Sequence, residues 1–271
     1  MLNYRSYIDL AACIKKHTQK LSGYDLYVGI PRSGLLAANM MALLLNKPVC
    51  TVQELVNNLN PQNGFSREVN NKRNYDKILV VDDTVNTGKS INYVKELLNN
   101  NEIDASYCAV YATEASREFV DMALEILERP RIFQWNYLNN SILKHSAVCF
   151  EDVICSKIKN PRVASDVEVF LNATSPNLLE NPQLKLIFTG YNRNVSNVIE
   201  SWLASHNICA DEIIYSDGKK MLNKLDNAFF ESHKDEFCNA KLVVLGSNCS
   251  AKQITSLLNV PCMAFNDKLY Q

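Results

Sequence analysis

ILVVDDTVNTGKS, residues 78–90, decides the fold class of this chain. The four apolar residues at 78–81 predict a strand that is buried on both faces, as in parallel sheets. Two acidic residues follow, and a turn containing Thr and Gly then leads into a helical pattern over 87–100. Strand, loop and helix in this order are the repeating unit of α/β folds.

The end of this stretch, Gly-Lys-Ser, invites comparison with a nucleotide-binding P-loop. That pattern requires a second glycine five residues before the glycine of Gly-Lys-Ser. Gly88 is the later glycine, and Asp83 stands at the earlier position. A carboxylate there would repel the phosphates that the backbone must approach, so the sequence excludes a P-loop.

A sugar phosphate explains the same residues better. Asp82 and Asp83 end the strand, where they can accept hydrogen bonds from the vicinal hydroxyls of a ribose. Gly88 allows a tight turn before the helix. Amides at the helix start suit a phosphate monoester, assisted by the hydroxyls of Thr84, Thr87 and Ser90. The simpler alternative is an ordinary strand–turn–helix with a capping aspartate.

The stretch resembles the signature of type I phosphoribosyltransferases, which bind 5-phosphoribosyl 1-diphosphate (PRPP). The resemblance implies that the 5-phosphoribosyl group is held by Asp82, Asp83, Thr84, Val85, Asn86, Thr87, Gly88, Lys89 and Ser90. GIPRSG, residues 29–34, follows the first predicted strand and resembles the diphosphate-binding loop of that family. Its matching residues are Pro31, Arg32, Ser33 and Gly34, and the arginine could neutralise the diphosphate.

A polar segment, 60–75, occupies the place of the flexible catalytic loop of that family. It carries Arg67, Lys72 and Arg73. Any of these could close over the diphosphate, and each could equally be a solvated loop charge. Arg67 joins Asp82, Asp83 and Arg32 as a catalytic candidate.

The reaction implied by the resemblance is nucleophilic substitution at C1 of the ribose. Mg²⁺ would be bound mainly through PRPP itself and would neutralise the leaving group. The acceptor is open, either a nucleobase or a glycan hydroxyl. Phe133, Trp135 and Tyr137, in the segment 131–140, could stack on it. We favour the alternative of a half-buried strand with its aromatic residues on one face.

A second α/β series follows, and we place the boundary between residues 1–140 and 141–271. The first part is expected to have the parallel-sheet type I phosphoribosyltransferase fold. The second part, Rossmann-like, resembles haloacid-dehalogenase-type hydrolases. Cys149 and Glu151 then stand where that family has its two catalytic aspartates, and Asp152 replaces a glycine.

Other motifs of the hydrolase family are partly kept. Thr189 and Gly190 resemble its phosphate-binding strand end, and Lys219 or Lys220 could match its lysine. Gly246, Ser247 and Asn248 stand where acids should bind Mg²⁺. Adjacent residues of a strand point to opposite faces, so Glu151 and Asp152 could not share one metal. We expect this domain to lack phosphatase activity, with an unorthodox phosphatase as an alternative.

The composition bears on the partners and the cellular compartment of the protein. The chain has 271 residues, 47 % of them hydrophobic, and a formal net charge of −1, which makes nucleic acid an improbable partner. Nine cysteines without CxxC pairs indicate free thiols in a reducing compartment, and no segment is apolar enough to span a membrane. We expect a cytoplasmic homodimer that is an active transferase, or else a non-catalytic PRPP or nucleotide sensor acting through a protein partner.

Overall fold

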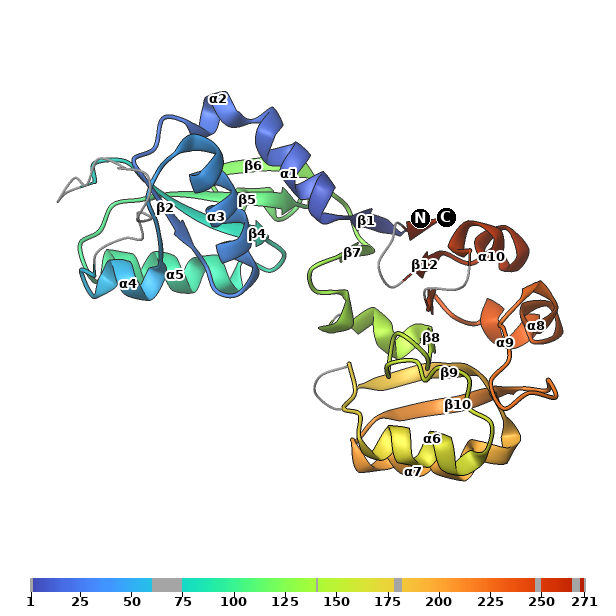
Figure 1. Ribbon diagram of the computed structural model, residues 1–271. Helices are drawn as coiled ribbons and strands as arrows, with labels where there is room; N and C mark the ends of the chain where they lie inside the picture. Colours follow the sequence, from blue (N-terminus) through green and yellow to red (C-terminus); the bar gives the residue numbers. More distant parts are fainter. Residues whose placement is uncertain are drawn as a thin grey trace. The chain divides into compact units, whose positions relative to one another are not determined.

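The computed structural model describes residues 2–59, 75–139, 141–177, 182–246, 250–264 and 269–270. The chain divides into two compact units (Figure 1). The first unit is Asn3–Trp135, and the second is Asn136–Gln271 together with Met1–Leu2. The division comes a few residues before the predicted boundary at 140.

The first unit is built on a parallel five-stranded sheet with the order β3-β2-β4-β5-β6. Counted along the chain this is 2-1-3-4-5, a doubly wound order. The strands are β2 (Leu26–Gly29), β3 (Val49–Thr51), β4 (Ile78–Thr84), β5 (Ser106–Ala112) and β6 (Met122–Ile126). β6 was not predicted from the sequence.

Helices cover both faces of this sheet (Figure 1). On β4, Leu79 and Val81 pack toward one face, while Ile78 and Val80 pack toward the other, which is why the strand is apolar throughout. One face carries α1 (Tyr7–Lys16), α2 (Thr18–Leu21) and α3 (Ser33–Leu45), and the other carries α4 (Val52–Val56) and α5 (Lys89–Asn99).

The two ends of the first unit pair with each other. β1 (Asn3–Arg5) and β7 (Arg131–Phe133) form a parallel two-stranded sheet. β7 corrects the prediction of one aromatic strand through 131–140, because it ends at Phe133. Trp135 lies beyond the strand, and Tyr137 belongs to the second unit. The three rings therefore share no strand face.

The second unit holds a six-stranded sheet with the order β10-β9-β8-β11-β12-β13. All neighbouring pairs are parallel except β12 with β13. Counted along the chain, its parallel strands have the order 3-2-1-4-5 of dinucleotide-binding folds. They are β8 (Ser146–Cys149), β9 (Gln183–Asn192), β10 (Cys209–Ser216), β11 (Leu242–Leu245) and β12 (Cys262–Ala264), with β13 (Leu269–Tyr270) at the edge.

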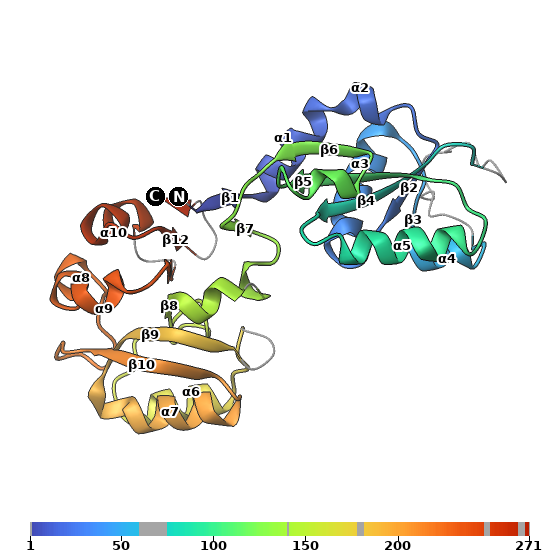
Figure 2. The same cartoon turned by 180° about the vertical axis from the view of Figure 1, so that it is seen from behind.

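Two groups of helices cover this second sheet (Figure 2). α6 (Ala164–Asn172) and α7 (Ser196–Ser205) lie together, and Trp202 of α7 packs edge-on against Phe150. Phe188 of β9 points instead into the rings of Phe230 and Phe237. Those rings belong to the other group, which is α8 (Asn227–Ser232), α9 (Lys234–Cys238) and α10 (Ala251–Leu258).

Short 3-10 helices complete the described elements, at Arg117–Phe119, Tyr137–Asn139, Ser141–His145 and Arg193–Val195. Within the described part of the chain, no helix has the length and apolar character needed to cross a bilayer.

Candidate functional site

The candidate site lies where the strand order of the first sheet reverses. β2 and β4 are neighbours, but the chain continues from β2 outward to β3 and from β4 outward to β5. The loops after β2 and β4 therefore leave the sheet side by side, which is where ligands bind in doubly wound folds. The amide of Ile30 donates to the carbonyl of Val81 at 2.9 Å and joins the two loops.

The two acids of the motif are both buried at this point. Asp83 is 1 % exposed and Asp82 is 9 % exposed. Asp83 Oδ1 accepts a hydrogen bond from Ser33 Oγ at 2.7 Å, and Asp83 Oδ2 accepts one from Trp135 Nε1 at 2.6 Å. The Asp83 carboxylate thus connects the loop after β4 to the loop after β2 and to the last residue of the first unit.

Asp82 is in a less favourable environment for a charge. Its Oδ1 accepts a local hydrogen bond from the amide of Asp83 at 3.0 Å. Burial, followed by the negative charge of Asp83, raises the pKa of Asp82 to about 8. The carboxyl of Asp82 therefore changes its charge near neutral pH, and a ligand that offers hydroxyl donors would favour the ionised form.

The loop after the acids presents polar groups to solvent. Asn86, Thr87, Lys89 and Ser90 are exposed. Gly88 has a φ of 71°, and a Cβ there would lie 2.7 Å from the Phe119 ring, so both backbone conformation and space require glycine. α5 begins directly after it, with first-turn amides that have no partner within the helix.

Two neighbours fix the base of this loop. The amide of Val85 donates to the carbonyl of Tyr111 at 3.0 Å, and the carbonyl of Val85 accepts from Arg131 Nη2 at 2.7 Å. Thr84 Oγ1 is buried without a hydrogen-bond partner among the described residues. An unpaired buried hydroxyl is costly, so a polar partner that reached Thr84 Oγ1 would offset that cost.

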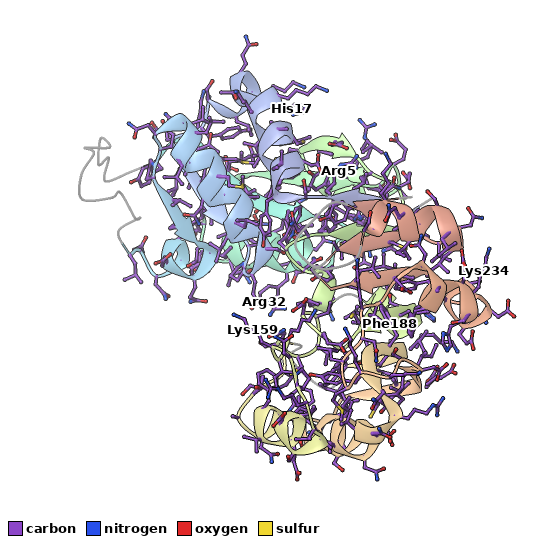
Figure 3. All side chains as sticks on the ribbon, turned by 45° about the vertical axis from the view of Figure 1, so that its right-hand side comes forward. Arg5, His17, Arg32, Lys159, Phe188 and Lys234 are labelled. Carbon is purple, nitrogen blue, oxygen red and sulfur yellow. The ribbon has the colours of Figure 1, made fainter. Side chains whose placement is uncertain are left out.

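The loop after β2 approaches β4 very closely. α3 begins at Ser33, and a Cβ on Gly34 would lie 2.6 Å from the carbonyl oxygen of Val81. Only glycine lets this helix start against the acidic pair. Pro31 and Arg32 are exposed at the turn itself (Figure 3). The Arg32 side chain is thus exposed at the edge of the site, without an ion pair to any described residue.

The predicted site residues Arg67, Lys72 and Arg73 lie outside the described residues. Trp135 and Arg131 were not predicted as part of the loop scaffold. The sequence suggests Trp135 for stacking on the acceptor or, as the favoured alternative, as part of a half-buried strand; its ring packs on Phe133 at 4.9 Å between centroids. Its N–H is engaged with an acid 52 positions earlier, a distance over which the sequence carries no local signal.

No metal cluster is built by the described residues alone: nowhere among them do three His, Cys, Asp or Glu side chains gather. The acidic pair is the closest approach to one in the site, and Asp83 already has two protein donors. The acidic pair supplies carboxylate oxygens, which are the type of ligand that Mg²⁺ prefers.

The second unit places its predicted residues differently from the expectation. β8 ends at Cys149, so Glu151 and Asp152 are not on a strand, and Asp152 has a φ of 69° in a turn. Glu151 is buried, and its Oε1 accepts from Thr189 Oγ1 at 2.6 Å and from the amide of Gly190 at 3.0 Å. Ser247 and Asn248 lie outside the described residues.

Residues 4–139 match the family of the phosphoribosyl transferase domain. Similar solved structures include the purine phosphoribosyltransferase from Pyrococcus horikoshii Ot3, which is 16 % identical over 49 % of this chain and 93 % of that one, with a TM-score of 0.37. The Helicobacter pylori xanthine-guanine-hypoxanthine phosphoribosyltransferase is 16 % identical over 50 % of this chain and 92 % of that one, with a TM-score of 0.39.

The orotate phosphoribosyltransferase from Aeropyrum pernix is 21 % identical over 44 % of this chain and 70 % of that one, with a TM-score of 0.33. None of the curated proteins matches the chain in sequence. The matched segment takes up half of the chain and contains both loops of the site. Through residues 4–139, this chain belongs to the phosphoribosyl transferase domain family.

Proposed function

We propose that the chain transfers the 5-phosphoribosyl group of PRPP to an acceptor, with Mg²⁺ and with release of diphosphate. The observation that carries this proposal is the placement of Asp82 and Asp83. They stand at the switch point of the sheet, between a loop suited to phosphate and a loop that ends in an exposed arginine.

Each part of PRPP has a counterpart in the site. The ribose hydroxyls donate to Asp82 and Asp83, because a carboxylate has about four acceptor positions and the two protein donors on Asp83 leave room. The 5-phosphate binds the loop 84–90 at the start of α5. The diphosphate lies toward Arg32.

The reaction exchanges one bond at C1 of the ribose for another. The bond from C1 to the diphosphate oxygen breaks, and diphosphate leaves with the electron pair. A lone pair of the acceptor forms the new bond to C1, and the acceptor loses its proton. Bound Mg²⁺ would supply charge neutralisation on the leaving group. The protein holds the sugar in place, which is the larger part of catalysis in such transfers.

The first experiment is calorimetric titration with PRPP and Mg²⁺. The variant Asp82→Asn/Asp83→Asn keeps the shape of both side chains and removes both charges. Each lost charge-assisted hydrogen bond is worth about 1.5–3 kcal/mol, so binding should weaken about 100-fold or more. The matched control is Asp235→Asn/Glu236→Gln, which neutralises an adjacent acidic pair at the start of α9 and should leave binding unchanged.

Turnover then separates transferase from sensor. Diphosphate release is measured with a panel of nucleobases and sugar hydroxyls as acceptors, and sedimentation tests the proposed homodimer. PRPP binding without release for any acceptor would favour the non-catalytic regulator. Absence of PRPP binding by the unchanged protein would overturn both.

A further inference from the structure

The second unit contains a large pocket at the carboxyl ends of its central strands. The pocket has a volume of about 1160 Å³ and is lined at its base by Cys149, Glu151, Gly190 and Gly246. Cys149 ends β8, Glu151 and Gly246 follow the ends of β8 and β11, and Gly190 lies two residues before the end of β9. The strand order reverses between the neighbours β8 and β11, so the carboxyl ends of these strands form the ligand-binding edge of a doubly wound sheet. The volume suits a ligand of nucleotide size.

Three described donors at the base of the pocket are already engaged. Thr189 Oγ1 and the amide of Gly190 both donate to Glu151, as does Cys149 Sγ at 3.5 Å. A carboxylate of the protein thus takes the hydrogen bonds that a phosphate oxygen would need at this strand end. Cys149 is 2 % exposed, and its thiol donates to the Glu151 carboxylate. Among the described residues, these donors are therefore engaged with Glu151 rather than offered to a phosphate.

The rim of the pocket is strongly basic. It is formed by two loops, one between β8 and α6 and the other between β10 and α8. All six basic side chains are exposed, and none forms an ion pair with a described residue. They are Lys157, Lys159 and Arg162 on the first loop, and Lys219, Lys220 and Lys224 on the second. We call these six residues the basic rim.

This concentration of charge is unusual for the chain as a whole, whose net charge is −1. Glu151 and Asp152 are the acidic residues among those that line the pocket. Six like charges around one concavity repel one another, and a multivalent anion would relieve that repulsion. Figure 3 shows Lys159 of the rim at the surface of the unit and Phe188 in its interior.

The two loops are held in place without a ligand. The amide of Asn223 donates to the carbonyl of Gly190 at 2.7 Å, and the side-chain amide of Asn192 donates to the carbonyl of Lys220 at 2.9 Å. On the opposite loop, the amide of Arg162 donates to Asp166 Oδ2 at 2.8 Å. Fixed loops lower the entropic cost of binding at the rim.

We propose that this pocket binds a small organic molecule carrying at least two phosphate groups, and that it holds the molecule without hydrolysing it. The phosphates lie on the basic rim rather than at the strand end, where Glu151 takes the donors. The organic part enters the cavity, past the partly buried Met221 and Leu222. A sugar bisphosphate and a nucleoside diphosphate share this chemistry.

The test uses the full-length chain and two probes, fructose 1,6-bisphosphate and adenosine 5′-diphosphate, with fructose as an uncharged comparison. Calorimetry should show binding of at least one phosphorylated probe at or below about 1 mM, and none of fructose. Lys219→Glu/Lys220→Glu should weaken that binding at least about tenfold, because two charge-assisted contacts are lost. Lys157→Ala/Lys159→Ala, on the other loop, should weaken it by a similar factor.

The matched control is Lys234→Glu/Lys252→Glu, two exposed lysines of the same unit that do not line the pocket. It should change the dissociation constant by less than about twofold, which shows that position and not net charge matters. Melting curves of the rim variants should show no loss of stability, because the changes reduce repulsion.

Three results would overturn the proposal. The first is the absence of binding by either probe. The second is equal weakening in the rim variants and in the control. The third is release of phosphate from a probe that stops in Glu151→Gln or Cys149→Ala, because the pocket would then be a phosphatase. Intact probe recovered after prolonged incubation supports a binding pocket.

Discussion

The two units bury a carboxylate at the same kind of place and use it in different ways. In the first unit, the donors to Asp83 come from a neighbouring loop and from the end of the unit, Ser33 and Trp135. In the second, the donors to Glu151 are Thr189 and Gly190 at the end of the adjacent strand. The hydrogen bonds of Asp83 therefore join separate segments of the chain around a site. Glu151 instead occupies the donors of the adjacent strand. The partners of a buried acid, rather than its burial, indicate whether a ligand can use it.

The largest effect on this difference between the two units is expected from adding one methyl group to a glycine in each of them. Gly34→Ala would place a Cβ 2.6 Å from the carbonyl oxygen of Val81, a backbone atom that cannot rotate away. The start of α3 must move, and misplacement by about 1 Å can cost a factor of about 100 in function. We expect PRPP binding, measured by calorimetry, to weaken by about that factor.

Gly190→Ala is the counterpart in the second unit, where the new Cβ would meet the carbonyl of Asn223. It should displace the rim loop and weaken fructose 1,6-bisphosphate binding, while PRPP binding stays within about twofold. If Gly34→Ala left PRPP binding unchanged, the close approach of α3 to β4 would have no part in the site.

Each unit contains one tryptophan whose N–H donates a hydrogen bond, and removing that donor should have a smaller effect than the glycine substitutions. Trp135→Phe keeps a ring against Phe133 but removes the N–H that donates to Asp83. A hydrogen bond to a charged group is worth about 1.5–3 kcal/mol, so the KM for PRPP should rise about tenfold or more. The KM is measured from steady-state diphosphate release. If there is no turnover, the dissociation constant for PRPP is measured instead.

Trp202→Phe is the control, because this indole donates to the carbonyl of Leu171 in the second unit. It should lower the free energy of unfolding by about 1 kcal/mol and leave the KM unchanged. An equal effect of both variants on the KM would contradict a specific role for Trp135.

The smallest expected effect concerns pH. Burial raises the pKa of both Asp82 and Glu151 in the folded chain. The folded state then binds more protons than the unfolded state, so stability falls as pH rises through the window from the usual carboxyl range up to the raised pKa. For Asp82 this window runs from about 4 to about 8. Asp82→Asn should therefore gain stability relative to the unchanged protein across it, by more than about 1 kcal/mol.

Glu151→Gln should also gain stability relative to the unchanged protein as the pH rises. Urea unfolding at a series of pH values measures the free energy of unfolding of both variants. A wild-type stability that rose steadily from pH 4 to pH 8, with both variants following it in parallel, would show that neither acid is held at an unfavourable charge.

The sequence predicted the elements that depend on local pattern. The apolar run before Asp82 and the glycines of the two loops identified β4, the loop after β2 and the edge of the sheet where they meet. Hydrogen bonds between segments that are distant in the sequence could not be predicted. Examples are those of Trp135 to Asp83 and of Arg131 to Val85. The hydrogen bond between Glu151 and Thr189 could not be predicted for the same reason, because these two residues lie far apart in the sequence. The basic rim was not predicted: the sequence indicated Lys219 or Lys220 only as a match for the hydrolase lysine, because the two loops of the rim lie far apart along the chain.

The pairing of β1 with β7 has a consequence for how the chain is made. The strand Asn3–Arg5 is made before the other strands of its unit, but its partner, Arg131–Phe133, is the last strand of the same unit. Trp135, which completes the contacts of Asp83, follows two residues after that partner. The first unit therefore cannot close until its final residues have emerged, and its ligand site is finished at the same moment. A chain that has emerged only as far as residue 130 therefore carries all five strands of the sheet beside an unfinished site.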